Sequence, residues 1–304
     1  MRMAIFDRVS QGLALFADAT VAVKVALFFG SWGLIWLPIA VPLAIALRWH
    51  PPQPLTMQQK LPLVISLYLL APPILWGFAW AESTPFSDYG LTWQLSVVLA
   101  LSQGVGVGVI GLLILFGVQA RWGWVIWQRE QWSSLWPGVL PTLVLGLGIG
   151  AIEELIFRGF LLQQFSRLTS LETLPPLATF LVAAALASLL FALLHLVWEG
   201  AENSPQLPAL WLRGMVLCLA RWADHGSLGL AWGLHTGWIW GMASLETAQL
   251  VRYSESAPAW LTGVGQKPLA GLLGLMFLAI TGGLVGLWGW NQAATFALIR
   301  VTLS

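Results

Sequence analysis

Two adjacent carboxylates, an arginine and two histidines interrupt stretches of sequence that are otherwise apolar. Glu153 and Glu154 end an uncharged stretch, Arg158 follows Glu154 by four residues, and His195 and His235 lie within later apolar stretches. Ionisable groups in segments that cross a membrane are energetically costly, so their presence there indicates a functional site. A carboxylate and two imidazoles in a wet cavity can activate a water molecule and stabilise an oxyanion.

The spacing of the two glutamates predicts different surroundings for them. Residues four apart share a helix face, which favours an ion pair between Glu154 and Arg158. Glu153 is turned by about 100° from Glu154 on the same helix, which keeps it away from that pair. One carboxylate is then held by arginine, and the other is free to act as a general base. The alternative is that all three charges close one helix–helix contact.

The two histidines also have alternative interpretations. His195 follows Phe191 by four residues, so both lie on one helix face near the end of an apolar stretch, with Phe191 as a supporting residue. A lone histidine in such a helix is also typical of a hydrogen-bonded packing residue. His235 lies in the middle of its stretch between Gly233 and Gly237, which permit close approach of a neighbouring helix.

The elements that must position these residues are membrane helices. Of the 304 residues, 58% are hydrophobic and 9% are charged, against about 25% charged residues in a soluble domain. Crossing the hydrocarbon core takes about 20 mostly apolar residues as a helix. Stretches of this kind recur at 25–47, 61–81, 89–120, 131–152, 173–198, 207–223, 225–245 and 268–299.

We therefore predict an all-α fold, a polytopic membrane helical bundle of about eight transmembrane helices. Seven spans are the alternative, because Arg213 and Arg221 interrupt the stretch 207–223. We expect these arginines to extend toward the lipid headgroups from near the helix ends. The single Cys218 excludes an internal disulfide and a multi-cysteine metal site.

The chain divides by composition into five parts, all of them tied to the membrane. A net charge of +1 provides no basic surface for nucleic acid, so we expect no nucleic-acid partner. The apolar stretches make membrane lipid the expected partner. The parts are an interfacial N-terminal segment at 1–24, three membrane spans at 25–121, a tryptophan-rich interfacial connection at 122–137, a core carrying the polar cluster at 138–248, and a loop with the C-terminal span at 249–304.

Three motifs in the core resemble those of a known family. EELIFR, residues 153–158, matches the EExxxR motif of the CAAX protease and bacteriocin-processing family of intramembrane endopeptidases. FALLH, residues 191–195, is similar to its FxxxH motif, and GSLGLAWGLHTGW, residues 226–238, resembles its third motif. The motifs follow the family order, each in a hydrophobic stretch. The resemblance covers roughly residues 138–248, which it identifies as a catalytic core.

The resemblance implies a role for each matching residue. Glu153 would be the general base and His195 its partner on the water, with His235 as a donor on the oxyanion side. Glu154 and Arg158 would be the supporting pair. The implied activity is hydrolysis of a peptide bond in or beside the membrane, with a peptide or protein as substrate and the protein as an integral, multi-pass membrane enzyme.

The sequence departs from the family pattern at one position. The third motif expects Asn or Asp four residues after its histidine, where this chain has Ile239. Isoleucine donates no hydrogen bond, and losing one oxyanion donor typically costs about 10²–10³ in rate. Either Trp238, Trp240 or Thr236 substitutes, or the chain is a weak or inactive relative that acts as a membrane scaffold or binding protein.

Metal and cofactor chemistry remain as alternatives. Two histidines and a glutamate would make a three-ligand zinc site with an open position, but the chain has no HExxH motif. The resemblance favours metal-independent hydrolysis, so we expect no cofactor, with zinc as the alternative. Transport is disfavoured because the charges cluster at one site and no pair of broken helices is evident.

One glycine-rich segment fits a nucleotide-binding template without its context. GVGVIG, residues 106–111, lies in an uncharged stretch with no strand before it. We interpret the glycines of this stretch and of the one before Glu153 as sites of close helix packing. They are Gly104, Gly106, Gly108, Gly146, Gly148 and Gly150.

Overall fold

The computed structural model of the chain describes residues 16, 18–50, 52–170 and 174–303, and it is built almost entirely of helices. Most of the predicted interfacial segment 1–24 lies outside the described residues. The helices are α2 (Val21–Ala46), α3 (Met57–Ala81), α4 (Leu95–Arg121), α5 (Leu135–Glu154), the π-helix η3 (Leu155–Leu161), α6 (Leu162–Ser170), α7 (Pro176–Glu199), α8 (Leu207–Ala223), α9 (Gly229–Thr247), α10 (Ala259–Thr262) and α11 (Leu272–Leu303).

In the described residues, five short 3₁₀ segments and two strands connect these helices. The 3₁₀ segments are η1 (Phe86–Tyr89), η2 (Arg129–Ser134), η4 (Ala201–Gln206), η5 (Val264–Gln266) and η6 (Pro268–Ala270). The strands β1 (Val125–Trp127) and β2 (Val251–Tyr253) form an antiparallel pair that the all-α prediction did not contain. Strands of three residues are too short to show an alternating pattern in the sequence.

The predicted polytopic helical bundle is confirmed, and the predicted number of about eight spans agrees only approximately with the structure. Within the part of the chain that the structure describes, six helices are long and apolar enough to cross a membrane. They are α2, α3, α4, the continuous helix 129–168, α7 and α11. The other two predicted spans are also helices, but α8 has only 17 residues and α9, with 19, is less apolar.

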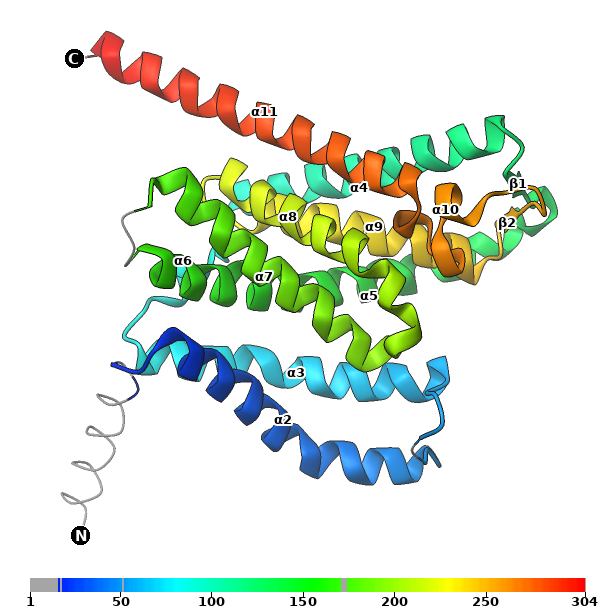
Figure 1. Ribbon diagram of the computed structural model, residues 1–304, viewed down its shortest axis with the longest axis horizontal. Coiled ribbons are helices and arrows are strands. Elements are labelled where there is room, and N and C mark those ends of the chain that lie inside the picture. The colour runs from blue at the N-terminus through cyan, green and yellow to red at the C-terminus, as the bar shows by residue number, and fades with distance from the viewer. Residues whose placement is uncertain (1–15, 17, 51, 171–173, 304) are drawn as a thin grey trace.

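Helix α9 lies at the centre of the part that carries the site, with α4 on one side and α5 on the other (Figure 1). Glycines permit both approaches: a Cβ on Gly104 of α4 would lie 2.6 Å from the Leu230 carbonyl oxygen, and one on Gly150 of α5 would lie 2.9 Å from Thr236 Oγ1. Gly108 and Gly146 make similar approaches to α9.

The packing prediction was wrong for Gly106 and Gly148, which have nothing within 4 Å of an added Cβ. Residues four apart share a helix face, whereas residues two apart do not, so only alternate glycines of each run face α9.

A π-helix follows the two glutamates directly. A π-turn widens the helix and leaves carbonyl groups without their usual partners, and such turns occur often at functional sites. Here Arg221 of α8 donates from Nη1 to the carbonyl oxygens of Arg158 and Gly159, the second at 3.3 Å. Arg221 Nη2 also donates to the Asp88 carbonyl oxygen at 2.9 Å. Arg221 therefore stabilises the π-turn. The prediction that it extends toward the lipid headgroups was wrong.

Candidate active site

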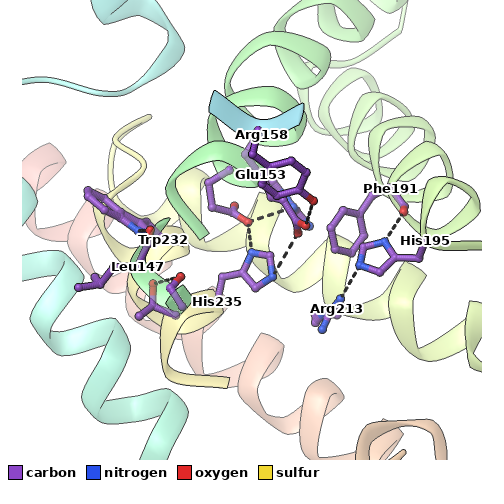
Figure 2. Close-up of polar contacts among 12 residues, drawn as sticks. Leu147, Glu153, Arg158, Phe191, His195, Arg213, Trp232 and His235 are labelled. Carbon is purple, nitrogen blue, oxygen red and sulfur yellow. Dashed lines mark hydrogen bonds and ion pairs between the residues drawn. The ribbon is translucent and has the colours of Figure 1, made fainter. Parts of the chain in front are cut away.

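Glu153, near the end of α5, contacts side chains from two other helices (Figure 2). The Tyr68 hydroxyl of α3 donates a 2.5 Å hydrogen bond to Glu153 Oε1. His235 Nε2 of α9 lies 3.5 Å from Glu153 Oε2. The Glu153 side chain is 8% exposed, whereas that of Glu154 is completely buried. Of the two carboxylates, Glu153 is thus the one that reaches open space.

Glu154 is held by a positive charge and an imidazole. Its Oε1 accepts a 3.0 Å bond from Arg158 Nη1 and lies 2.7 Å from His235 Nδ1. Because Arg158 supplies a positive charge beside the carboxylate, Glu154 acts as the acceptor and His235 carries its proton on Nδ1. Nε2, the other ring nitrogen of His235, then presents a lone pair toward Glu153. His235 therefore bridges the two glutamates, and Glu154 determines its tautomer.

His195, late in α7, lies between a carbonyl oxygen and a guanidinium (Figure 2). Its Nδ1 is 2.8 Å from the Phe191 carbonyl oxygen, and its Nε2 is 3.3 Å from Arg213 Nη2. A guanidinium has no acceptor, so His195 Nε2 accepts from Arg213 and the ring proton resides on Nδ1, where it donates to Phe191. His195 is therefore neutral in this arrangement.

The Phe191 ring separates the two arginines of the site. Arg158 Cζ lies 4.5 Å from the ring centroid and Arg213 Cζ lies 5.2 Å from it. The ring face attracts cations, which adds to the hold on both guanidinium groups. The ring is completely buried and packs 4.4 Å from the His195 ring, centroid to centroid. Phe191 thus orients the arginines as well as His195.

One cavity of about 630 Å³ joins these groups. Its walls include Glu153, His195 and His235, the three residues predicted to be catalytic, together with Arg213 and Ile239. The structure therefore brings together residues from α5, α7, α8 and α9 that lie up to 82 positions apart in the sequence, His235 being 82 residues after Glu153. A cavity of this size is in the ordinary range for a substrate site.

Sequence reasoning missed two of the site's residues. Arg213 was expected to extend toward the headgroups, but it lines the cavity and contacts His195. The reason is that α8 packs against α7 and directs this side chain inward. Tyr68 was not singled out, although a polar hydroxyl within the uncharged stretch 61–81 was a usable signal. An arginine within a predicted span was a stronger one.

The three predicted replacements for the Asn or Asp of the family pattern do not line the cavity, and one of them, Thr236, donates from Oγ1 to the Gly146 carbonyl oxygen at 3.3 Å. Trp240 donates from Nε1 to the Val139 carbonyl oxygen at 2.9 Å. Trp238 is completely buried against Phe277 of α11, at 6.2 Å between ring centroids. Neither indole lines the cavity, whereas Ile239 does. The geometry therefore does not support the prediction that Trp238 or Trp240 supplies the hydrogen bond of the missing Asn or Asp.

The zinc alternative does not fit the arrangement of donors. Among the described residues, no three His, Cys, Asp or Glu side chains form a group that could hold a metal ion. His195 Nε2 faces the Arg213 guanidinium, which would repel a cation placed there. We therefore derive no chemical step through a metal.

Part of the chain that contains this site matches a model of a known protein family. Residues 134–241 match the family model described as Rce1-like, type II CAAX prenyl endopeptidase. No curated protein and no solved structure matches the chain. The matched segment contains Glu153, His195, Arg213 and His235, and it excludes Tyr68. The chain is therefore an integral, multi-pass membrane protein, and about a third of it, residues 134–241, is similar to the type II CAAX prenyl endopeptidases.

Proposed function

We propose that this protein is an endopeptidase that hydrolyses a peptide bond in or beside the membrane, using a water molecule activated by Glu153. The observation that carries the proposal is the shared cavity, in which a carboxylate, two imidazoles and a guanidinium face one space inside a helical membrane bundle. Buried ionisable groups of this kind are retained in membrane proteins mainly for function.

Glu153 is the general base of the proposed reaction. Tyr68 occupies its Oε1, which leaves Oε2 for a water molecule. Both Glu153 Oε2 and His235 Nε2 are acceptors, and they lie 3.5 Å apart. A water that donates one hydrogen to each would direct its lone pairs away from them, toward a substrate carbonyl in the cavity. His235 is then the partner on the water, a role that the family resemblance had assigned to His195.

The bond changes follow from this placement. Glu153 takes a proton from the water as the water oxygen forms a bond to the carbonyl carbon, and the carbonyl π electrons move to its oxygen. When the tetrahedral intermediate collapses, those electrons re-form the C=O bond and the C–N bond breaks. Glu153 returns the proton to the leaving amine. Glu154 and Arg158 take no part in bond making, but they keep His235 in the required tautomer.

Arg213 is the group that we assign to the developing oxyanion. His235 donates its ring proton to Glu154, so it has none to offer on the cavity side, and Ile239 has no donor. The Arg213 guanidinium lines the same cavity, is permanently charged and is held beside His195 and Phe191. A charged donor forms stronger hydrogen bonds than the neutral amide of Asn. His195 thus serves as a positioning residue for Arg213.

The second candidate function is a non-catalytic binding protein, which Ile239 favours. The test uses purified protein in lipid nanodiscs with a peptide library, comparing the wild type with Glu153→Gln. Cleavage by the wild type and its loss in Glu153→Gln would support the endopeptidase. Binding of peptides without cleavage in either form would favour the binding protein.

A further inference from the structure

Strand β2 lies beside the cavity, and it is paired with β1 along one edge and open along the other. Strand β2 lies between two cross-strand bonds that fix the ladder. Gln128 N donates to the Leu250 carbonyl oxygen at 2.9 Å, and Ser254 N donates to the Trp124 carbonyl oxygen at 2.9 Å. In an antiparallel pair, alternate residues bond to the partner strand. The middle residue of β2, Arg252, therefore also bonds to β1, opposite Ile126.

The remaining residues of β2 face the other way. Val251 and Tyr253 direct their N–H and C=O groups to the edge opposite β1. In the described part of the chain, no hydrogen bond outside the regular elements uses these four groups. An unpaired strand edge of this kind is a template for adding another strand.

The cavity of the candidate active site reaches this edge. Val251, Arg252 and Tyr253 all line it, and Lys267 and Pro268 lie on its walls as well. Successive side chains of a strand point to opposite faces, so a single cavity that meets three consecutive residues runs along the edge of the strand. The open backbone groups therefore face the space that leads to Glu153.

We propose, on the basis of the proposed function, that the open edge of β2 binds the substrate as an added strand. The occupant is an extended polypeptide segment whose main chain bonds to Val251 and Tyr253. Such bonds recognise a backbone in the extended form with little regard for sequence.

The length of α9 relates this strand site to the cleaved bond. From His235 to Thr247 the helix advances twelve residues, or about 18 Å at 1.5 Å per residue. An extended chain covers about 3.3 Å per residue, so the same distance takes about five or six residues. Because β2 begins four residues after the end of α9, we expect it to hold the substrate roughly five or six residues from the bond that is cut.

The test measures binding separately from cleavage. The probe is a fluorescent peptide of about twelve residues, taken from the library as the best substrate of the wild type or, if none is cut, as the best binder. Its affinity for full-length Glu153→Gln in nanodiscs is measured by anisotropy, together with variants that carry one N-methyl group at each position in turn. We expect N-methylation to weaken binding by about fivefold or more at alternate residues of one short segment, because only alternate N–H groups face β2.

A matched pair of variants examines the protein side. Val251→Pro removes an N–H that is not part of the β1–β2 ladder, a position where proline is tolerated in an edge strand. Val251→Thr keeps that N–H. We expect Val251→Pro to weaken binding of the twelve-residue peptide and Val251→Thr to leave it unchanged. Peptides that end within three residues of the cleaved bond do not reach β2, so they should bind equally to both variants.

The outcomes separate the two proposals. Uniform sensitivity to N-methylation, no sensitivity, or no measurable binding of any library peptide would overturn the strand site. If Val251→Pro fails to fold, the N-methyl series on the unaltered strand still decides. Absence of cleavage by the wild type would contradict the endopeptidase, while the anisotropy result would continue to decide the role of β2.

Discussion

Replacing Arg213 is the most direct test of the reaction proposed here. Arg213 Nη2 lies 3.3 Å from His195 Nε2, and Ile239 adds no donor to the cavity. If Arg213 stabilises the oxyanion, Arg213→Gln removes the positive charge and displaces the donor. The loss of one oxyanion donor costs about 10²–10³ in kcat. We expect a fall of that size in kcat/KM, with little change in KM, since the contact strengthens only in the transition state.

Arg213→Lys should have an intermediate effect. It keeps the charge but loses the planar fork and the contact of the guanidinium with the Phe191 ring, which is 5.2 Å away. We expect a loss of about tenfold to a hundredfold. The matched control is Arg129→Gln, which alters an exposed arginine that does not line the cavity and should leave kcat/KM unchanged.

The combination with Ile239→Asn distinguishes catalysis from a purely structural role. Restoring the family's donor should do little in the wild type, where Arg213 already serves, but it should raise the activity of Arg213→Gln by about tenfold or more. Initial rates on a fluorogenic peptide provide the measurement. Our reasoning is refuted if Arg213→Gln cuts within threefold of the wild-type rate while Glu153→Gln is inactive, since the oxyanion would then lie elsewhere.

Three further outcomes follow from the same geometry. Tyr68→Phe removes the hydroxyl that bonds to Glu153 Oε1 at 2.5 Å, and kcat should fall about tenfold while the melting temperature changes little; an unchanged kcat would exclude Tyr68 from the site. Chelation with 1,10-phenanthroline should leave peptide cleavage intact, and inhibition that added zinc reverses would favour the metal alternative. Gly104→Ala puts a Cβ 2.6 Å from the Leu230 carbonyl oxygen and should destabilise the protein by about 1–3 kcal/mol in detergent unfolding. Gly106→Ala, with nothing within 4 Å, should be neutral or stabilising; equal losses would contradict the packing of α4 on α9.

The sequence alone determined those features that depend on residues close together within one helix. Uncharged stretches identified the membrane helices because burial in lipid requires long apolar segments. The four-residue spacing of Glu154 and Arg158 predicted a pair that the structure contains at 3.0 Å, since that spacing alone brings two side chains onto one helix face. The EExxxR motif, whose residues lie within two helical turns, likewise indicated the resemblance to CAAX proteases that residues 134–241 show.

Only the tertiary structure decided which helices face one another and at what rotation. Tyr68 reaches Glu153 across 85 residues, and Arg213 reaches His195 from a neighbouring helix. These contacts depend on how whole helices pack, and no periodicity within one segment records that. The roles that we propose for His195 and His235 rest on contacts of the same kind, because the tautomer of each ring follows from its neighbour in space. The open edge of β2 exists only because the ends of α4 and α9 lie together, which lets two strands of three residues pair.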